Sequence, residues 1–323
     1  MQINGQATIN GNDDGEIVVS VLTPCYNHEK YIRKCIESII GQKTNFKFEL
    51  LINDDASTDH SAKIIKEYEE KYPDIVKPVY QTENQYSKGV KITANVLVPR
   101  AKGKYIAFCE GDDYWTDENK LQKQVDALES HPDCYFCTHR VQMVRENDEE
   151  IPYAFFPSFP LKSGIIKSEI VIGWYNFQTC SFFFKKSAYS DFLNQPRRYR
   201  EVSIVGDLPM LLFAVEKGKV YYFDEVMSRY RKGSVSSVNT TASKKQRIRF
   251  FENMIEVLEE FDKYTEGKFR KAIKKRIKRE EFCLNKADGN KRKMPFRSFC
   301  YFLDHVKKYL SVRLKYDKSG RKK

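Results

Sequence analysis

The sequence predicts an α/β fold in which a mostly parallel central sheet is flanked by helices and followed by a basic helical extension. Short apolar segments rich in β-branched residues alternate with segments whose apolar residues recur at helical spacing. The apolar segments are nearly continuous, which is typical of strands buried on both faces. Strands separated by single helices form βαβ units, so neighbouring strands run parallel.

The individual elements follow from the spacing of apolar residues and from the residues that end each run. The predicted strands are 17–23, 48–52, 75–80 and 105–109. One predicted helix covers 31–40 and ends at Gly41, and another carries the helically spaced Ile64, Ile65, Tyr68 and Tyr72. A third helix reaches residue 101 before the fourth strand.

Charge divides the chain into three segments. Residues 1–16 are polar, residues 17–240 form a near-neutral body, and residues 241–323 hold 26 Lys and Arg against 11 Asp and Glu. The predicted domains are therefore an N-terminal segment (1–16), a catalytic domain (17–240) and a basic helical extension (241–323). No apolar run approaches the about 18 residues of a membrane-spanning helix, and the first 16 residues lack an apolar signal-peptide core. A cytoplasmic protein is the expectation.

Polar residues follow three of the predicted strands. Thr23-Pro24-Cys25-Tyr26-Asn27 overlaps the end of the first strand, Asn53-Asp54-Asp55 follows the second, and Glu110-Gly111-Asp112-Asp113 follows the fourth. Ligands of parallel sheets bind beyond the carboxyl ends of the strands, so these segments are the expected site. Glycine-rich phosphate loops of the dinucleotide-binding or ATPase type do not occur in the sequence.

Glu110, Asp112 and Asp113 place three carboxylates within four residues. Their mutual repulsion is most simply relieved by a divalent cation, and oxygen ligands favour Mg²⁺ or Mn²⁺. A solvated acidic turn, or a cap for a helix that starts near Asp117, fits the same residues. Asp54 and Asp55 likewise have a structural interpretation, because Asp-Asp-x-Ser-x-Asp forms turns and helix caps.

Three motifs taken together resemble the family-2 glycosyltransferases, which are inverting, nucleotide-sugar-dependent enzymes of GT-A fold. The motifs are VVSVLTPCYN (18–27), LLINDDASTD (50–59) and GKYIAFCEGDD (103–113), and the resemblance extends over about residues 1–235. It implies a soluble, metal-dependent enzyme that transfers a sugar from a nucleotide-diphosphate sugar to an acceptor hydroxyl. A UDP-sugar donor and a glycan or lipid-linked glycan acceptor in bacterial cell-surface polysaccharide or lipopolysaccharide assembly are the expected substrates.

The resemblance also implies roles for single residues. Asp113 would bind Mn²⁺ or Mg²⁺ together with Asp112, which would also lie near the ribose. Glu110 departs from the family pattern, which has Asp at this position. The nucleotide would be held by residues after the first two strands and by a basic residue before the fourth: Pro24, Tyr26, Asp54, Asp55 and Lys91, with Lys88 as the alternative to Lys91.

Two later segments match further parts of the family. Asp207, in Gly-Asp-Leu-Pro-Met, corresponds to the general base, and Glu201 is its acidic competitor nearby. The same Asp is also a favourable helix N-cap. Arg231 and Lys232 lie in a segment (230–236) that resembles the loop folding over the diphosphate, although an exposed basic linker fits equally well.

The basic extension contains helically spaced apolar residues that are expected to dock on the body: Phe250, Phe251, Met254, Ile255, Leu258 and Phe261. Cations are dense at 271–279 and 291–297, and an apolar stripe follows at 299–310. A basic amphipathic helix is typical of a membrane surface, but a solvated helical face fits too. An anionic membrane is therefore one expected partner, on the inner face of the cell membrane, and no nucleic acid is expected.

Two other functions fit parts of the pattern. A sugar nucleotidyltransferase shares the α/β body, but it requires a glycine-rich basic loop directly after the first strand, where this chain has Pro24-Cys25-Tyr26-Asn27. A catalytically inactive protein that binds a nucleotide sugar or carbohydrate would not need its acidic motifs intact. The sequence does not indicate which sugar is moved.

Overall fold

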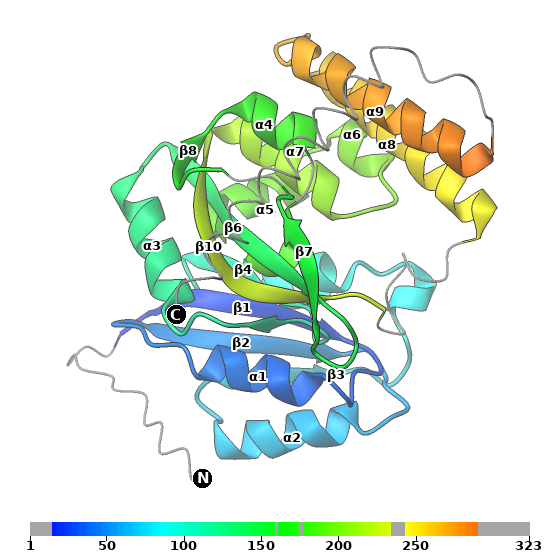
Figure 1. Cartoon of the computed structure of the whole chain (residues 1–323). Helices are drawn as coiled ribbons and strands as arrows, with labels where there is room; N and C mark the ends of the chain where they lie inside the picture. Colours follow the sequence, from blue (N-terminus) through cyan, green and yellow to red (C-terminus); the bar gives the residue numbers. More distant parts are fainter. Residues whose placement is uncertain (1–14, 159–160, 175–176, 234–242, 290–323) are drawn as a thin grey trace, which may run out of the picture.

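The computed structural model describes residues 15–158, 161–174, 177–233 and 243–289, and it shows a curled sheet covered by helices on both faces (Figure 1). The sheet has ten strands, with the path β3-β2-β1-β4-β9-β6-β10-β5, while β7 pairs with β6 and β8 with β10. The strands are β1 (Ile17–Cys25), β2 (Lys47–Asp54), β3 (Val76–Tyr80), β4 (Tyr105–Phe108), β5 (Tyr114–Trp115), β6 (Cys134–Val144), β7 (Glu150–Phe156), β8 (Gly164–Ile166), β9 (Phe183–Lys185) and β10 (Lys219–Arg231).

The predicted parallel arrangement is confirmed for the first half of the sheet. β3, β2, β1 and β4 are all parallel, with β1 between β2 and β4. The second half is mixed: β6 and β10 are parallel, whereas β9 runs antiparallel to β4 and β6. The carboxyl ends of β1, β2 and β4 consequently lie along one edge of the sheet.

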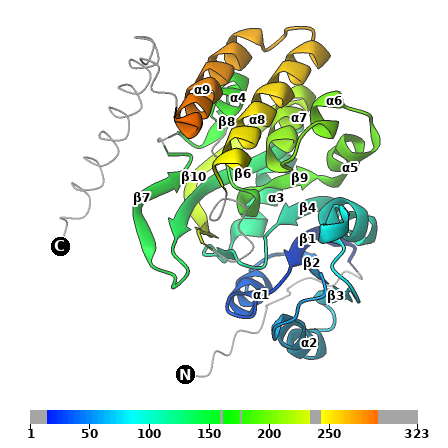
Figure 2. The same ribbon diagram turned by 90° about the vertical axis from the view of Figure 1, so that its right-hand side faces the viewer.

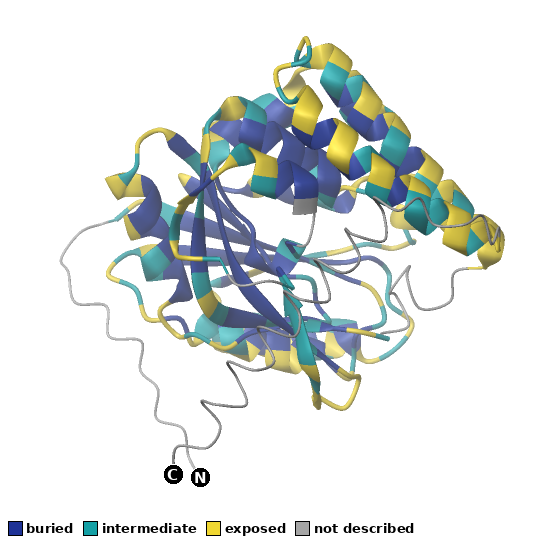
Figure 3. Ribbon diagram, turned by 45° about the horizontal axis from the view of Figure 1, so that its top comes forward, coloured by how far each residue is buried: buried dark blue, intermediate teal, exposed yellow. Residues whose placement is uncertain are grey.

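Alternating residues of β1 pack into two different cores. Val19 and Val21 belong to one cluster, which also contains Ile32 and Ile36 from α1 (Ile32–Ile40). Leu22 points to the opposite face and joins a second cluster with residues of α4 (Ser168–Trp174), α5 (Lys186–Asn194) and α7 (Asp207–Lys217). Both faces of the strand are therefore buried, which explains its continuous apolar sequence. Figure 3 shows the resulting buried sheet beneath partly exposed helices.

The helices occupy the two faces in order along the chain. α1 and α2 lie on one side of the sheet, and α4 to α9 lie on the other (Figures 1 and 2). The helices are α1 (Ile32–Ile40), α2 (Ser61–Lys71), α3 (Lys120–Ser130), α4 (Ser168–Trp174), α5 (Lys186–Asn194), α6 (Arg198–Glu201), α7 (Asp207–Lys217), α8 (Lys244–Tyr264) and α9 (Arg270–Asp288).

Irregular turns replace one predicted helix. The segment before β4 is a π-helical turn, η2 (Thr93–Leu97), followed by a 3₁₀ turn, η3 (Val98–Arg100), rather than a continuous α-helix. Pro99 lies in the 3₁₀ turn, where it lacks the N–H that an α-helix requires. The helix expected near Asp117 begins at Lys120 instead. Two further short 3₁₀ turns are η1 (Tyr86–Lys88) and η4 (Thr179–Ser181).

The first half of the basic extension belongs to the same core as the body. Met254, Leu258 and Phe261 of α8 are almost completely buried in the cluster that contains Leu22. α9 packs against α8 and α4, so it adds Ile273 to that cluster. The change of charge near residue 240 is therefore not a boundary in packing. The predicted apolar stripe at 299–310 lies outside the described residues.

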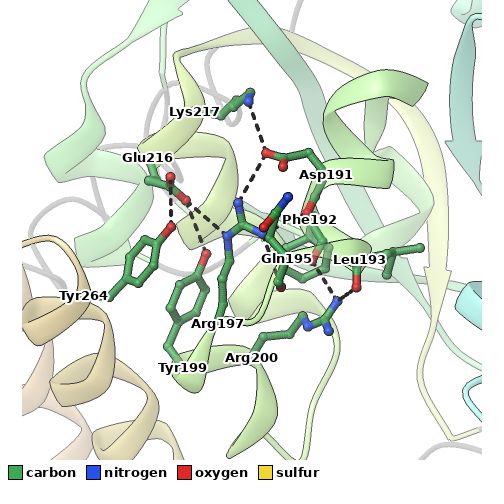
Figure 4. Close-up of polar contacts among 10 residues, drawn as sticks. All are labelled: Asp191, Phe192, Leu193, Gln195, Arg197, Tyr199, Arg200, Glu216, Lys217 and Tyr264. Atoms are coloured by element: carbon green, nitrogen blue, oxygen red, sulfur yellow. Dashed lines mark hydrogen bonds and ion pairs between the residues drawn. The ribbon is translucent and has the colours of Figure 1, made fainter.

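Polar contacts around Arg197 join helices from both sides of the charge boundary (Figure 4). The buried guanidinium of Arg197 lies 3.2 Å from Asp191 of α5 and 3.6 Å from Glu216 of α7. Glu216 also accepts hydrogen bonds from Tyr199, at 3.5 Å, and from Tyr264 of α8, at 3.4 Å. These contacts fix the C-terminal end of α7, whose opposite end carries Asp207.

Among the described residues, no helix combines the length and apolar character needed to cross a membrane.

Candidate functional site

The candidate site lies where β1, β2 and β4 end, and the loops that follow β1 and β2 are hydrogen-bonded to each other. The loop after β1 carries residues 26–30, and the loop after β2 carries residues 55–60. Three backbone N–H groups of the first loop donate to side chains on or just beyond the second: Asn27 to Ser57 Oγ at 2.9 Å, His28 to Ser61 Oγ at 2.8 Å and Glu29 to Asp59 Oδ2 at 3.0 Å.

One hydrogen bond runs in the opposite direction, from a backbone N–H of the second loop to a side chain of the first. The N–H of Thr58 donates to Asn27 Oδ1 at 2.8 Å. Asn27 and Ala56 both have positive φ, at 55° and 58°, which turns each loop sharply out of its strand. Ser57 and Asp59, which the sequence suggested as helix caps, thus hold two loops together with the help of Ser61. The pair forms a rigid wall for a ligand.

Asp55 organises a third loop. Its Oδ1 accepts the N–H of Gln85 at 2.9 Å, and its Oδ2 accepts the N–H of Tyr86 at 3.0 Å. Each carboxylate oxygen can accept a further hydrogen bond. Tyr86, in η1, is 68% exposed, and Tyr26 is 38% exposed. Two aromatic side chains thus remain accessible to a ligand beside the anchored carboxylate.

Four buried polar atoms along this edge have no hydrogen-bond partner within the described part of the chain. They come from the ends of three parallel strands: Thr23 Oγ1, Asn53 Nδ2, Asp54 Oδ1 and Glu110 Oε2. Burial also raises the pKa of Asp54 above its usual range. Unpaired buried polar atoms are costly, typically about 1–3 kcal/mol each. Their concentration at one edge indicates a place built for a polar ligand or ion.

Burial and mutual repulsion make the charged forms of the carboxylates after β4 less favourable. Burial is the main factor that raises the pKa of Glu110 to about 7, and the nearby carboxylates of Asp112 and Asp207 add to it. Burial, with Asp112 and Glu110, likewise raises the pKa of Asp113. Asp113 is 2% exposed, and its Oδ1 accepts the N–H of Arg231 at 2.8 Å.

Asp207 lies near enough to the acidic motif for its charge to add, after burial and Asp112, to the raised pKa of Glu110. It is the first residue of α7 rather than its N-cap, which is Gly206. Its Oδ1 accepts the N–H of Leu208 at 2.9 Å. Glu201, the competing candidate, is exposed and lies 4.0 Å from Arg198. The structure therefore brings Asp207 to the acidic motif and pairs Glu201 elsewhere.

No motif in the sequence points to η4, whose residues interact with the acidic motif. A hydrogen bond from Thr179 lowers the pKa of Glu110, and one from Cys180 lowers that of Asp113. Trp115 Nε1 donates to the carbonyl oxygen of Cys180 at 3.2 Å, which fixes this turn. These residues sit in an aromatic-rich segment without a recognisable motif, so only the fold reveals their proximity.

Gly111 is required inside the motif for a steric reason. A Cβ at this position would lie 2.8 Å from His28 Nδ1 and 3.3 Å from the carbonyl oxygen of Pro24. The N–H of Gly111 donates to that Pro24 oxygen at 3.1 Å. The absence of a side chain thus lets the acidic motif approach the loop after β1, and it ties Pro24 to the motif.

The predicted basic residues are placed differently from the expectation. Arg231 is 2% exposed, and its guanidinium is engaged by groups of the protein itself, which differs from the predicted contact with a diphosphate. Lys232 is exposed, and residues 234–236 of the predicted loop lie outside the described residues. Lys91 is exposed just before η2. Among the described residues, no hydrogen bond or ion pair joins Lys91 to Glu110, Asp112 or Asp113. Lys88 pairs with Glu83.

The carboxylates fit a divalent cation held jointly by protein and ligand. Within the described ranges, no group of three or more His, Cys, Asp or Glu side chains is arranged to enclose a metal. Mg²⁺ is commonly bound by one or two carboxylates plus substrate phosphates, not by a complete protein cage. Asp112, Asp113 and the unpartnered Oε2 of Glu110 suit that arrangement.

The chain belongs to glycosyl transferase family 2, whose model matches residues 20–192. Over 137 residues it is 41% identical to the uncharacterized protein Rv1520 of Mycobacterium tuberculosis, covering 42% of this chain and 39% of that protein. It is 29% identical over 153 residues to the poly(ribitol-phosphate) beta-N-acetylglucosaminyltransferase TarS of Staphylococcus aureus, covering 47% of this chain and 25% of TarS. The matches thus span well under half the length of these relatives.

Solved structures share the fold. Residues 1–349 of TarS superpose with a TM-score of 0.59 at 17% identity, covering 91% of this chain and 80% of the TarS chain. The mannosyltransferase PcManGT from Pyrobaculum calidifontis, in complex with GDP-Man and Mn²⁺, gives a TM-score of 0.53 at 17% identity, covering 93% and 83%. The predicted GT-A fold is confirmed.

The contacts of Asp55 generate a prediction for nucleotide binding. Asp55→Ala removes the acceptor for the N–H groups of Gln85 and Tyr86, and it removes the carboxylate that the family resemblance assigns to the nucleotide. UDP affinity measured by calorimetry should fall by about 1.5–3 kcal/mol, the size of a charge-assisted hydrogen bond. Glu83→Ala, in the same loop but without contact to Asp55, is the matched control. Equal UDP affinity of Asp55→Ala and wild type would refute a role in nucleotide binding.

Proposed function

We propose that this protein is a metal-dependent, inverting glycosyltransferase that moves a sugar from a UDP-sugar to an acceptor hydroxyl. The observation that carries the proposal is the convergence of Glu110, Asp112 and Asp113 with Asp207 at one edge of the sheet. Membership of glycosyl transferase family 2 supports glycosyl transfer as the reaction class.

Asp113 and Asp112 would hold Mn²⁺ or Mg²⁺ together with the donor diphosphate. Such a cation supplies electrostatic stabilisation of the negative charge on the departing nucleotide diphosphate. The protein offers too few ligands for a complete cage in the described ranges, so we expect the cation and the nucleotide to bind together. The nucleotide base would lie against Tyr26 and the loops anchored by Asp55.

Asp207 acts as the general base in this mechanism. Its carboxylate accepts the proton of the acceptor hydroxyl while that oxygen attacks the anomeric carbon. The bond between the anomeric carbon and the diphosphate oxygen breaks, and its electron pair leaves with the nucleotide diphosphate. One displacement inverts the anomeric configuration.

The donor base and the acceptor are supported by relatives and neighbours. TarS has been crystallised in complex with UDP-GlcNAc, and that structure shares this fold with a TM-score of 0.56 at 19% identity. The name of TarS states that it acts on poly(ribitol-phosphate). We therefore favour UDP over GDP as the donor nucleotide, and a glycan or lipid-linked glycan of the bacterial cell surface as the acceptor.

The rival functions make different demands on the site. A sugar nucleotidyltransferase needs a basic phosphate loop after β1, where this chain has a loop bonded to Ser57 and Ser61 instead. An inactive binding protein would bind a nucleotide sugar without releasing the nucleotide. The test of Asp207 separates that alternative from catalysis.

Asp207→Asn is expected to abolish transfer while preserving the fold. The amide oxygen of Asn can still accept the N–H of Leu208, so the melting temperature and UDP affinity should remain near wild type. Sugar transfer, followed as nucleotide release with acceptor present, should fall by ~10²-fold or more. Glu201→Gln is the matched control and should retain activity. Normal transfer by Asp207→Asn would exclude Asp207 as the base.

The described part of the extension also favours an anionic membrane surface as a partner. Lys271, Lys274 and Lys278, here called the α9 lysine face, lie at spacings of three and four residues on one side of α9. All three are exposed, and no ion pair to them occurs within the described ranges. Like charges at this spacing destabilise a helix by about 0.2–0.5 kcal/mol per pair, so the face has no structural benefit.

α9, which carries the α9 lysine face, lies at the opposite end of the molecule from α1 and α2 (Figures 1 and 2). Each cation near an anionic lipid surface can contribute ~1 kcal/mol. We propose that this face holds the enzyme at the inner surface of the cell membrane, next to a lipid-linked acceptor.

Replacing all three lysines of the α9 lysine face with Gln should weaken co-sedimentation with phosphatidylglycerol-containing vesicles by roughly 100-fold, given ~1 kcal/mol per cation. Wild-type binding should also fall as salt rises, since exposed charges are screened. The control replaces Lys47, Lys63 and Lys66 of the body with Gln. It changes the net charge by the same amount and should bind like wild type. Equal loss in both triple variants would show that only net charge matters.

A further inference from the structure

The side chain of Arg231 is the largest charged group buried beside the acidic motif. Arg231 is the last residue of β10 and is 2% exposed. A guanidinium taken out of water is expensive unless its donors are paired, and replacing buried ion pairs by apolar residues is often neutral or stabilising. The fold alone therefore does not explain why a cation occupies this position.

Arg231 contacts two consecutive residues of the motif. Its backbone N–H donates to Asp113 Oδ1 at 2.8 Å, and its Nε donates to the carbonyl oxygen of Asp112, also at 2.8 Å. One carboxylate oxygen of Asp113 is thereby fixed by β10. The side chain of Arg231 at the same time holds the main chain of Asp112, so both the backbone and the side chain of Arg231 orient the motif from which the Asp113 carboxylate projects.

The outer end of the guanidinium is held by the turn between β6 and β7. Nη1 donates to the carbonyl oxygens of Arg145 at 3.1 Å and Glu146 at 2.9 Å, and Nη2 lies 2.7 Å from Asp148 Oδ1. Asp148 is itself bonded to Lys34 of α1 at 2.8 Å. One side chain thus connects β10, the β6–β7 turn and the acidic motif.

An aromatic ring completes the enclosure. The guanidinium lies 4.3 Å from the ring centroid of Tyr31 and 5.7 Å from that of Tyr114. Three carbonyl oxygens, the carboxylate of Asp148 and two aromatic rings surround the planar guanidinium, an arrangement that a lysine could not match. All three guanidinium nitrogens contact groups of the protein itself, which opposes a direct approach to a diphosphate.

We propose that Arg231 is a positioning residue that aims the carboxylate of Asp113 at the divalent cation, instead of contacting the donor itself. This inference rests on the proposed function, because it requires a cation at Asp113. It replaces the predicted direct contact of Arg231 with the diphosphate. Outer-shell partners of metal ligands typically change metal affinity by about 10–100-fold, which sets the expected size of the effect.

The test compares Arg231→Lys, Arg231→Gln and Asp148→Asn with wild type. Mn²⁺ affinity is measured in the presence of saturating UDP by electron paramagnetic resonance, and UDP affinity without metal is measured by calorimetry. Both Arg231 variants should bind Mn²⁺ at least about 10-fold more weakly, with metal-free UDP affinity unchanged. Asp148→Asn, outside the motif, should weaken Mn²⁺ binding in the same direction and to a smaller extent.

Arg229→Lys is the matched control. Arg229 lies two residues earlier on β10, and its guanidinium donates to Glu150 at 2.6 Å and to Thr116 Oγ1 at 3.3 Å, so these side-chain bonds are made outside the acidic motif. It should bind Mn²⁺ like wild type. A loss of metal-free UDP affinity in the Arg231 variants would mean direct donor contact. Normal Mn²⁺ binding with a lowered melting temperature would mean a structural role only; either result overturns the proposal. Failure of wild type to bind Mn²⁺ with UDP would instead refute the proposed function.

Discussion

The structure depends on one electrostatic constraint, which is the burial of several carboxylates at the end of β4. Burial raises the pKa of Glu110 and of Asp113, and the nearby charge of Asp112 adds to both shifts. Such a cluster is costly, so the surrounding fold has to hold it in place, and under the proposed function a cation relieves its charge. The N–H of Arg231, the hydrogen bonds from η4 and the approach allowed by Gly111 are the means by which the fold holds it.

The parallel half of the sheet supplies the rest of the site by geometry. Because β1, β2 and β4 run in the same direction, their loops meet at one edge, where hydrogen bonds between the β1 and β2 loops form a rigid wall. The antiparallel half serves another purpose, since β10 returns to the edge and ends at Arg231. α8 and α9 then fix α7 through the shared core and through Glu216, so Asp207 is held at a defined place.

Sequence patterns predicted the features that are local. The strand β1 and the helix α1 follow from apolar spacing, and the acidic residues after β2 and β4 follow from their position after buried strands. The antiparallel pairing of β9, the contact of Thr179 with Glu110 and the burial of Arg231 depend on residues far apart in the chain. Periodicity shows that a segment is buried but not which partner it meets, so those features could not be predicted. The docking of α8 on the body was predicted from its helically spaced apolar residues, and the burial of Leu258 and Phe261 in the shared core confirms it.

The central claim is that the buried carboxylates form a cation-dependent site for a nucleotide-diphosphate sugar. The most direct measurement is nucleotide release from a panel of UDP-sugars with Mn²⁺ or with EDTA, using wild type and Asp113→Asn. The account predicts release with Mn²⁺ by wild type only, with at least ~10²-fold less in EDTA or in the variant, the scale on which one electrostatic group at the reacting centre acts. Equal release in EDTA, or by Asp113→Asn, would contradict it.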